Sequence, residues 1–185
     1  MTGESRDPEF EAHLDAVIIG ARAPTPIVLA AYDDAWPVQF DQHRSRISAA
    51  LMNRARLIEH IGSTAVPGLT AKPIIDILVG VDDVEDEAMF LPALETAGYE
   101  LRVREPGHRM VRPPTHDAHV HIYTVGHQEI DACLALRDRL RADAADRAAY
   151  EARKRELAQR DWPDMNYYAR AKTDVIAEIL SRAQA

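Results

Sequence analysis

Two apolar runs rich in β-branched residues flank a polar turn in the first half of the chain. They cover Leu57–Ile61 and Ile74–Val81, and between them lie Gly62-Ser63-Thr64 and the dipeptide Pro67-Gly68. Short apolar runs bounded by glycine and proline are typical of buried β-strands. We therefore predict a strand, a tight polar turn, a short connection and a second, buried strand.

Helical and strand-like patterns alternate on both sides of this central unit. Before it, the apolar run at 27–32 predicts a short strand or an extended segment, and Trp36-Pro37 opens a helix that ends near Asn53. After it, Asp86–Ala97 has a helical pattern that Gly98 is well placed to end. Alternating patterns then predict three strands, at Tyr99–Arg104, His108–Arg112 and Ala118–Val125.

The last third of the chain is predicted to be helical. The helical pattern starts at Gln128, is interrupted at Asp161–Asp164 and resumes in a final amphipathic helix. The predicted fold class is α/β or α+β, with a mixed β-sheet flanked by helices and a C-terminal helical extension. We expect a flexible N-terminal arm at 1–26, a core at 27–127 and a helical part at 128–185 that packs on the core.

Composition narrows the function classes. The 185-residue chain has a net charge of −8, which argues against non-specific binding to nucleic acid or to anionic membranes. No apolar run approaches the roughly 20 residues needed to span a bilayer, and the start of the chain lacks a signal-peptide pattern, so we expect a cytoplasmic protein. The single cysteine, Cys133, cannot form an internal disulfide, and we expect it to be a packed thiol.

Asp76 is the first candidate for chemistry. It is a lone carboxylate in an apolar strand, which is costly unless the group is paired or bound to a metal ion. Ile74 and Leu78 share its face of the strand, so no second carboxylate accompanies it there. We favour a metal ligand or a general base over a structural acid that caps a helix or pairs with an arginine.

Two histidines are in phase on a later strand. His119 and His121 point to the same side, about 7 Å apart along the strand. They could bind a metal ion or a ligand together, or they could be a solvated pair on a sheet face. A metal ion held by Asp76 and these histidines would have nitrogen and oxygen ligands, which favours zinc, manganese or iron over magnesium. The other histidines considered as ligands are His60, His108, His116 and His127.

The turn after the first strand has the features of an anion site. Gly62 allows close approach of the backbone, and Ser63 and Thr64 add hydroxyl groups. Lys72 precedes the second strand and could meet a phosphate as a point charge, or it could be an ordinary surface lysine.

Further cations could contribute to anion binding. Arg109 could clamp an anion or simply balance acidic residues, and Arg137 lies close to the apolar stripe of its helix. Lys172 lies on the edge of a buried helix face, and we expect it to extend to solvent rather than into the site.

These residues resemble the GrpB family. The resemblance is carried by Glu59–Val79, with the sequence EHIGSTAVPGLTAKPIIDILV, and it extends from residue 27 to the C-terminus. The further matching segments are Tyr32 with Trp36-Pro37, Ala97-Gly98-Tyr99, His119-Val120-His121, Leu136-Arg137-Asp138-Arg139-Leu140-Arg141, and Tyr168 with Lys172.

The GrpB family in turn resembles the polymerase-β-like nucleotidyltransferases. That resemblance implies that Gly62 and Ser63 contact nucleotide phosphates and that Asp76 is one metal-binding acid. In those proteins a pair of acids and a third acid bind two magnesium ions. Here Ile74 or Leu78 takes the place of the paired acid, and His119 or His121 that of the third.

The resemblance leaves three functions open. The first is a transferase acting on a nucleotide or phosphorylated small molecule with a divalent ion (Mg, Mn or Zn). The second is a metal-dependent enzyme of other chemistry, and the third is a non-catalytic module that binds an anion or a nucleotide.

Overall fold

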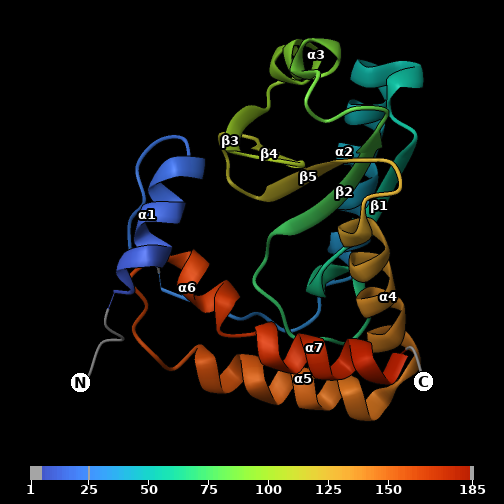
Figure 1. The fold of residues 1–185 in the computed structure, drawn as a ribbon. Coiled ribbons are helices and arrows are strands. Elements are labelled where there is room, and N and C mark those ends of the chain that lie inside the picture. The colour runs from blue at the N-terminus through green and yellow to red at the C-terminus, as the bar shows by residue number, and fades with distance from the viewer. Residues whose placement is uncertain (1–5, 25, 184–185) are drawn as a thin grey trace.

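A mixed five-stranded β-sheet forms the centre of the protein. The structure is a computed structural model that describes residues 6–24 and 26–183. Across the sheet the strands follow the order β1-β2-β5-β4-β3, as Figure 1 shows. The strands are β1 (Leu57–Ile61), β2 (Ile75–Val81), β3 (Glu100–Glu105), β4 (His108–Arg112) and β5 (Ala118–Thr124). All five had been predicted from the sequence to within two residues at each end.

The pairing of the strands places the candidate residues side by side. β1 and β2 are antiparallel, β2 and β5 are parallel, and β5, β4 and β3 are antiparallel neighbours. In the parallel pair, Asp76 lies directly opposite His119 and Leu78 opposite His121. Because side chains alternate along a strand, Asp76, His119 and His121 share one face of the sheet.

The opposite face of the sheet packs on the main hydrophobic core. Ile75, Ile77 and Val79 of β2 and Val120 and Ile122 of β5 are buried there. Helices α2 (Ala35–Leu51) and α3 (Leu91–Thr96) cover this face and contribute Trp36, Ile47, Leu51, Leu91 and Leu94.

The C-terminal helices form a second layer beside the other face. They are α4 (Gln128–Ala142), α5 (Ala144–Leu157), α6 (Met165–Arg170) and α7 (Thr173–Ala183). In Figure 1, α5 and α7 run side by side below the sheet and α4 rises along β1. Leu140 of α4, Tyr150 of α5 and Ile179 of α7 share a core with Val66 and Leu69 from the connection between β1 and β2. This connection is therefore fixed between the sheet and the helices.

A short helix, α1 (Pro8–Val17), completes the fold at the free edge of β3. Its Phe10 ring packs edge-on against Tyr167 of α6, with ring centroids 5.0 Å apart, and Ile18 forms a β-bridge with Val103. Within the described residues, no helix is long and apolar enough to cross a membrane.

One predicted element differs in the structure. The helix predicted over Asp86–Ala97 is instead a 3-10 turn at Glu87–Met89, a break at Phe90 and then α3. Pro92 suits the first turn of a new helix, and the Phe90 side chain is buried in the core, so the chain bends between them. For the segment at 27–32 the sequence left a short strand or an extended segment open; the structure has no named strand there, only an isolated bridge between Ala30 and Ala71.

Cys133 of α4 packs on the cluster of Ile61, Leu78, Tyr123 and Ile130. Burial raises the pKa of its thiol to about 11, so the group stays protonated at neutral pH. The prediction of a packed thiol is confirmed.

Candidate functional site

The turn after β1 brings the chain directly against Asp76. Gly62 has φ 69° and ψ −168°, a backbone conformation that is almost exclusive to glycine. A Cβ on Gly62 would lie 2.4 Å from Oδ2 of Asp76, so the carboxylate occupies the space that any other residue would need. A short 3-10 turn, Ser63–Ala65, follows, and its Ser63 lines the same cavity as Asp76.

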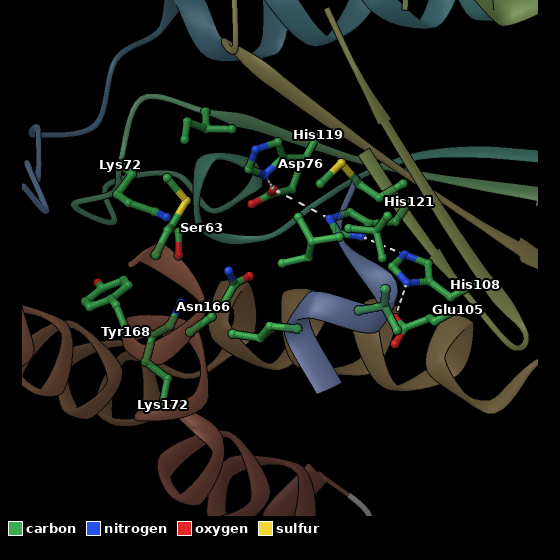
Figure 2. A pocket seen from close by; sticks show the side chains of 18 of the residues that line it. Ser63, Lys72, Asp76, Glu105, His108, His119, His121, Asn166, Tyr168 and Lys172 are labelled. Carbon is green, nitrogen blue, oxygen red and sulfur yellow. Dashed lines mark hydrogen bonds and ion pairs between the residues drawn. The ribbon is translucent and has the colours of Figure 1, made fainter. Parts of the chain in front are cut away.

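Asp76, His119 and His121 converge on the sheet face that the strand pattern predicted. Oδ1 of Asp76 lies 3.5 Å from Nδ1 of His119 and 3.9 Å from Nε2 of His121. The Asp76 side chain is enclosed by the walls of a cavity, yet 33% of its surface remains accessible. Figure 2 shows the three side chains pointing toward one another.

This environment keeps Asp76 ionised and His121 neutral. Burial raises the pKa of the Asp76 carboxyl, but the bond from His119 and the proximity of His121 and Lys72 outweigh that effect, so its pKa lies below the usual value. Burial, with a smaller contribution from the neighbouring His108, lowers the pKa of His121 to about 3 against the opposing effect of Asp76. At neutral pH the site therefore has one carboxylate beside a neutral imidazole.

A chain of hydrogen bonds leads from His121 to β3. Nδ1 of His121 is 3.1 Å from Nε2 of His108, and Nδ1 of His108 is 2.6 Å from Oε1 of Glu105. The His108 ring is stacked on that of Tyr123, and it is nearly parallel to the His121 ring to which it is hydrogen-bonded. The bond from His108 lowers the pKa of Glu105 more than burial raises it. The dashed lines of Figure 2 follow this series from Asp76 to Glu105.

Three lysines face the same cavity from three different parts of the fold. Lys72 lies just before β2, Lys154 on α5 and Lys172 between α6 and α7. The sequence contains only three lysines among its 22 basic residues, so every lysine of the chain lines this cavity. Within the part of the chain that the structure describes, no carboxylate forms an ion pair with any of them.

The lysines are enclosed, and they repel one another. Burial, together with the charge of Lys172, lowers the pKa of Lys72 to about 8 and that of Lys154 to about 7. Burial also lowers the pKa of Lys172 itself. Nζ of Lys154 donates to Oγ of Ser63 at 3.2 Å and to the backbone oxygen of Thr70. The Nζ atoms of Lys72 and Lys172 lie 5.4 and 4.8 Å from the ring centroid of Tyr168.

The cavity between these groups has a volume of about 340 Å³. Its sheet side contains the Asp76 cluster, and its helical side contains the lysines with Tyr168 and Asn166. Helix α1 lines one end with His13, Leu14 and Val17. Such a space is large enough for a small molecule.

Several predicted site residues have other roles in the structure. Arg109 does not line the cavity, since its buried guanidinium pairs with Glu85 and Glu87 on the opposite side of the sheet. Arg137 also lies outside, where it binds Glu59 and Asp138.

The residues of the turn after β1 do not all line the cavity. Ser63 and Thr64 line the cavity, but the Thr64 hydroxyl is also bonded to His60 at 3.0 Å. Gly62 is not among the lining residues and instead makes room for Asp76. His60 itself is buried and stacked on Phe40, which makes it a core histidine.

Part of the helical side of the cavity is not predicted by the sequence. Lys172 was expected to extend to solvent, but it turns into the cavity because the Tyr168 ring supports it from α6. Nothing local marks Lys154 as a residue of the cavity, since its helix has an ordinary amphipathic pattern. One signal was available: lysine is rare in this chain while arginine is frequent, and the three lysines are widely separated.

The Asp76 cluster fits a single metal ion. One oxygen of Asp76 and one ring nitrogen each of His119 and His121 lie within 4.8 Å of one another. One carboxylate and two imidazoles suit zinc or manganese better than magnesium, which prefers an all-oxygen shell.

Together these features define an α+β protein with a mixed sheet, flanking helices and an Asp-His-His cluster opposite a set of lysines. The GrpB protein family model matches residues 26–182, and the chain belongs to the GrpB family. Its relatives include a UPF0157 protein of Streptomyces coelicolor, 54% identical, with 91% of this chain and 90% of that protein covered. Another is a UPF0157 protein of Halalkalibacterium halodurans, 45% identical, with 96% and 94% covered.

Solved structures agree with this family. The crystal structure of the conserved protein GrpB from Enterococcus faecalis has a TM-score of 0.75 and 34% identity, with 84% of this chain and 96% of that chain covered. A structure of Cid1 with its short product ApU reaches a TM-score of 0.47 at 15% identity, covering 82% of this chain and 46% of that chain. We draw no inference from that lower likeness.

Proposed function

We propose that this protein binds the phosphate groups of a nucleotide or of a phosphorylated small molecule in the cavity, and that it transfers a phosphate-containing group. The observation that carries the proposal is the gathering of all three lysines around one cavity, opposite Asp76. Burying cations without carboxylate partners is costly, and an anionic ligand would offset that cost. Lysine binds phosphate as a point charge with three donors.

The ligand would lie with its phosphates toward the helices. Lys72 and Lys172 flank Tyr168 and leave their ammonium groups facing the cavity, while Lys154 and Ser63 are bonded to each other at its wall. The reacting end would then lie near Asp76 on the sheet. In this orientation the lysines neutralise the phosphate charge, and the reaction takes place near Asp76.

Asp76 is suited to accept a proton. Its carboxylate is ionised and lies beside a neutral His121, so it can take the proton of an attacking hydroxyl group as that oxygen bonds to phosphorus. The bond from phosphorus to the bridging oxygen of the leaving phosphate or pyrophosphate breaks in the same step, and that oxygen leaves with the bonding electron pair. A divalent ion held by Asp76, His119 and His121 would supply Lewis-acid stabilisation of charge on phosphate oxygens. The residues of the chain would then orient the acceptor and exclude water.

One observation favours a chemistry other than two-magnesium nucleotidyl transfer. Asp76 is the only acid on its face of β2, where Leu78 follows it, and its nearest ligand-type neighbours are histidines. We therefore keep a metal-dependent enzyme of other chemistry as the second candidate. It is distinguished by a transition metal that co-purifies with the protein and is lost in His121→Ala.

Calorimetry on the full chain tests the proposal. ATP, UTP and inorganic pyrophosphate would be titrated with magnesium or manganese into the wild type, Lys72→Met, Lys172→Met and Asp76→Ala. We expect binding in the wild type and at least a tenfold loss of affinity in each lysine variant. Arg44→Met, which removes an equal charge from an exposed site on α2, is the matched control. Absence of binding and turnover in the wild type would overturn the proposal.

A further inference from the structure

We infer that Glu105 and His108 are positioning residues that hold His121 in one tautomer, with the lone pair of Nε2 directed to the space beside Oδ1 of Asp76. This role deepens the proposed metal site and rests on it for its biological purpose. The tautomer itself can be measured whether or not a metal binds. The sequence marks His108 only as a further candidate ligand and points to no role for Glu105.

The direction of the hydrogen bonds starts at Glu105. An ionised carboxylate can only accept, so Nδ1 of His108 donates its hydrogen to Oε1 across 2.6 Å. At a pH where each imidazole carries one hydrogen, Nε2 of His108 has none and accepts the hydrogen of Nδ1 of His121 across 3.1 Å. Since a neutral imidazole has one hydrogen, Nε2 of His121 is left as a lone pair.

The distance between His121 and Asp76 agrees with this direction of the hydrogen bonds. Nε2 of His121 is 3.9 Å from Oδ1 of Asp76, too far for a hydrogen bond, so no acceptor holds a hydrogen on Nε2. The lone pair and the carboxylate therefore face each other across a gap. Two such acceptors repel unless a cation lies between them, and the third donor, His119, is on the same side.

The sheet fixes the geometry of the hydrogen bonds that join Glu105, His108 and His121. Glu105 and His108 are paired residues of the β3–β4 hairpin, and His121 lies on the adjacent strand β5. The His108 ring is stacked on Tyr123, with centroids 4.6 Å apart, which prevents the ring from turning away. Histidines that bind metals commonly donate their second N–H to such a partner, and loss of the partner weakens metal binding about 10–100-fold.

Nitrogen NMR of the metal-free, full-length protein with ¹⁵N-labelled histidines provides the direct test. In the wild type at neutral pH we expect the hydrogen of His121 on Nδ1 and none on Nε2. In Glu105→Gln, where the amide can donate to His108, we expect a mixture of His121 tautomers. His108→Phe keeps a ring beside Tyr123, removes the acceptor and should have the same effect. Glu100→Gln, an exposed position on the same strand, is the control and should leave the spectrum unchanged.

Zinc affinity provides a second readout, measured by competition with a chromogenic chelator. We expect about a 10–100-fold weaker affinity in Glu105→Gln and His108→Phe, and no change in Glu100→Gln. A wild-type His121 protonated on Nε2, or equal zinc affinity in all three variants, would overturn the inference. A wild type that has the expected tautomer but binds no metal would support the positioning role and refute the metal site.

Discussion

The carboxylate of Asp76 occupies the space in which a side chain of residue 62 would lie. A Cβ on Gly62 would be 2.4 Å from Oδ2 and 3.0 Å from Cβ of Asp76. Gly62 therefore leaves room for the Asp76 carboxylate, and it lets the turn after β1 pack directly against that carboxylate of β2. The sequence had suggested that Gly62 gives a ligand close access to the backbone.

Gly62→Ala should consequently affect both stability and the site. The φ of 69° and ψ of −168° lie in a region that costs other residues about 1–3 kcal/mol, and the added methyl group would displace Asp76. We expect a loss of stability of that size in urea denaturation and a marked loss of zinc or manganese affinity. Gly68→Ala is the control, because its φ is also positive at 78° but no atom lies within 4 Å of the added Cβ. Equal metal affinity in the two variants would contradict the role given to Gly62.

The sheet side of the site could be predicted from the sequence because it depends on local periodicity. Alternation along a strand places His119 and His121 on one face, and a lone acid in an apolar strand marks Asp76. The parallel pairing that sets Asp76 opposite His119 depends on strand order, which no local pattern encodes.

The helical side could not be predicted in the same way. Lys154 and Lys172 approach Lys72 only through the packing of α5, α6 and α7 beneath the sheet. The sequence around Lys154 and around Lys172 has an ordinary amphipathic pattern, so nothing local indicates that either side chain faces a cavity. For Arg109 the sequence left an anion clamp or a partner of acidic residues open, and strand alternation puts the side chain on the other face, where it pairs with Glu85 and Glu87.

Arg109→Leu should destabilise the protein and leave anion binding intact. The Arg109 side chain is 6% exposed and pairs with Glu85 and Glu87 at 2.6 and 2.5 Å. Because Glu85 is half exposed and Glu87 keeps its pair with Arg104, the loss is that of the hydrogen bonds of a buried guanidinium, about 1–3 kcal/mol, which urea denaturation would measure. Arg56→Leu breaks an exposed pair with Asp82 and should cost less than about 1 kcal/mol. Weaker pyrophosphate binding in Arg109→Leu, with stability unchanged, would instead mean that Arg109 contacts the ligand.

Stability should rise with pH between 7 and 8.5. Burial lowers the pKa of Lys154 from 10.5 to about 7 and that of Lys72 to about 8. In this range the unfolded chain binds more protons than the folded chain, so the free energy of unfolding increases, by at most about 1.4 kcal/mol per pH unit for each proton of difference. Urea denaturation at several pH values would measure the slope.

Variants and the choice of range make this pH test specific. Lys154→Met should have a smaller slope than the wild type, while Arg44→Met should keep the wild-type slope. Above pH 8.5 the Cys133 thiol opposes the trend, because burial raises its pKa to about 11 and only the unfolded chain then ionises. A slope that is flat or negative between pH 7 and 8.5 would show that these amines stay charged in the folded protein.

Acetylation of the amines should report directly on occupancy of the cavity. Lys72 and Lys172 are partly accessible, and their lowered pKa values increase the fraction of reactive neutral amine at pH 8, whereas Lys154 is only 2% exposed. Mass spectrometry after brief treatment with an acetylating reagent should find Lys72 and Lys172 modified and Lys154 largely unmodified. Saturating pyrophosphate should protect Lys72 and Lys172, while a neutral sugar at the same concentration should not. Because the chain has no other lysine, unchanged rates with pyrophosphate would mean that phosphate does not bind between them.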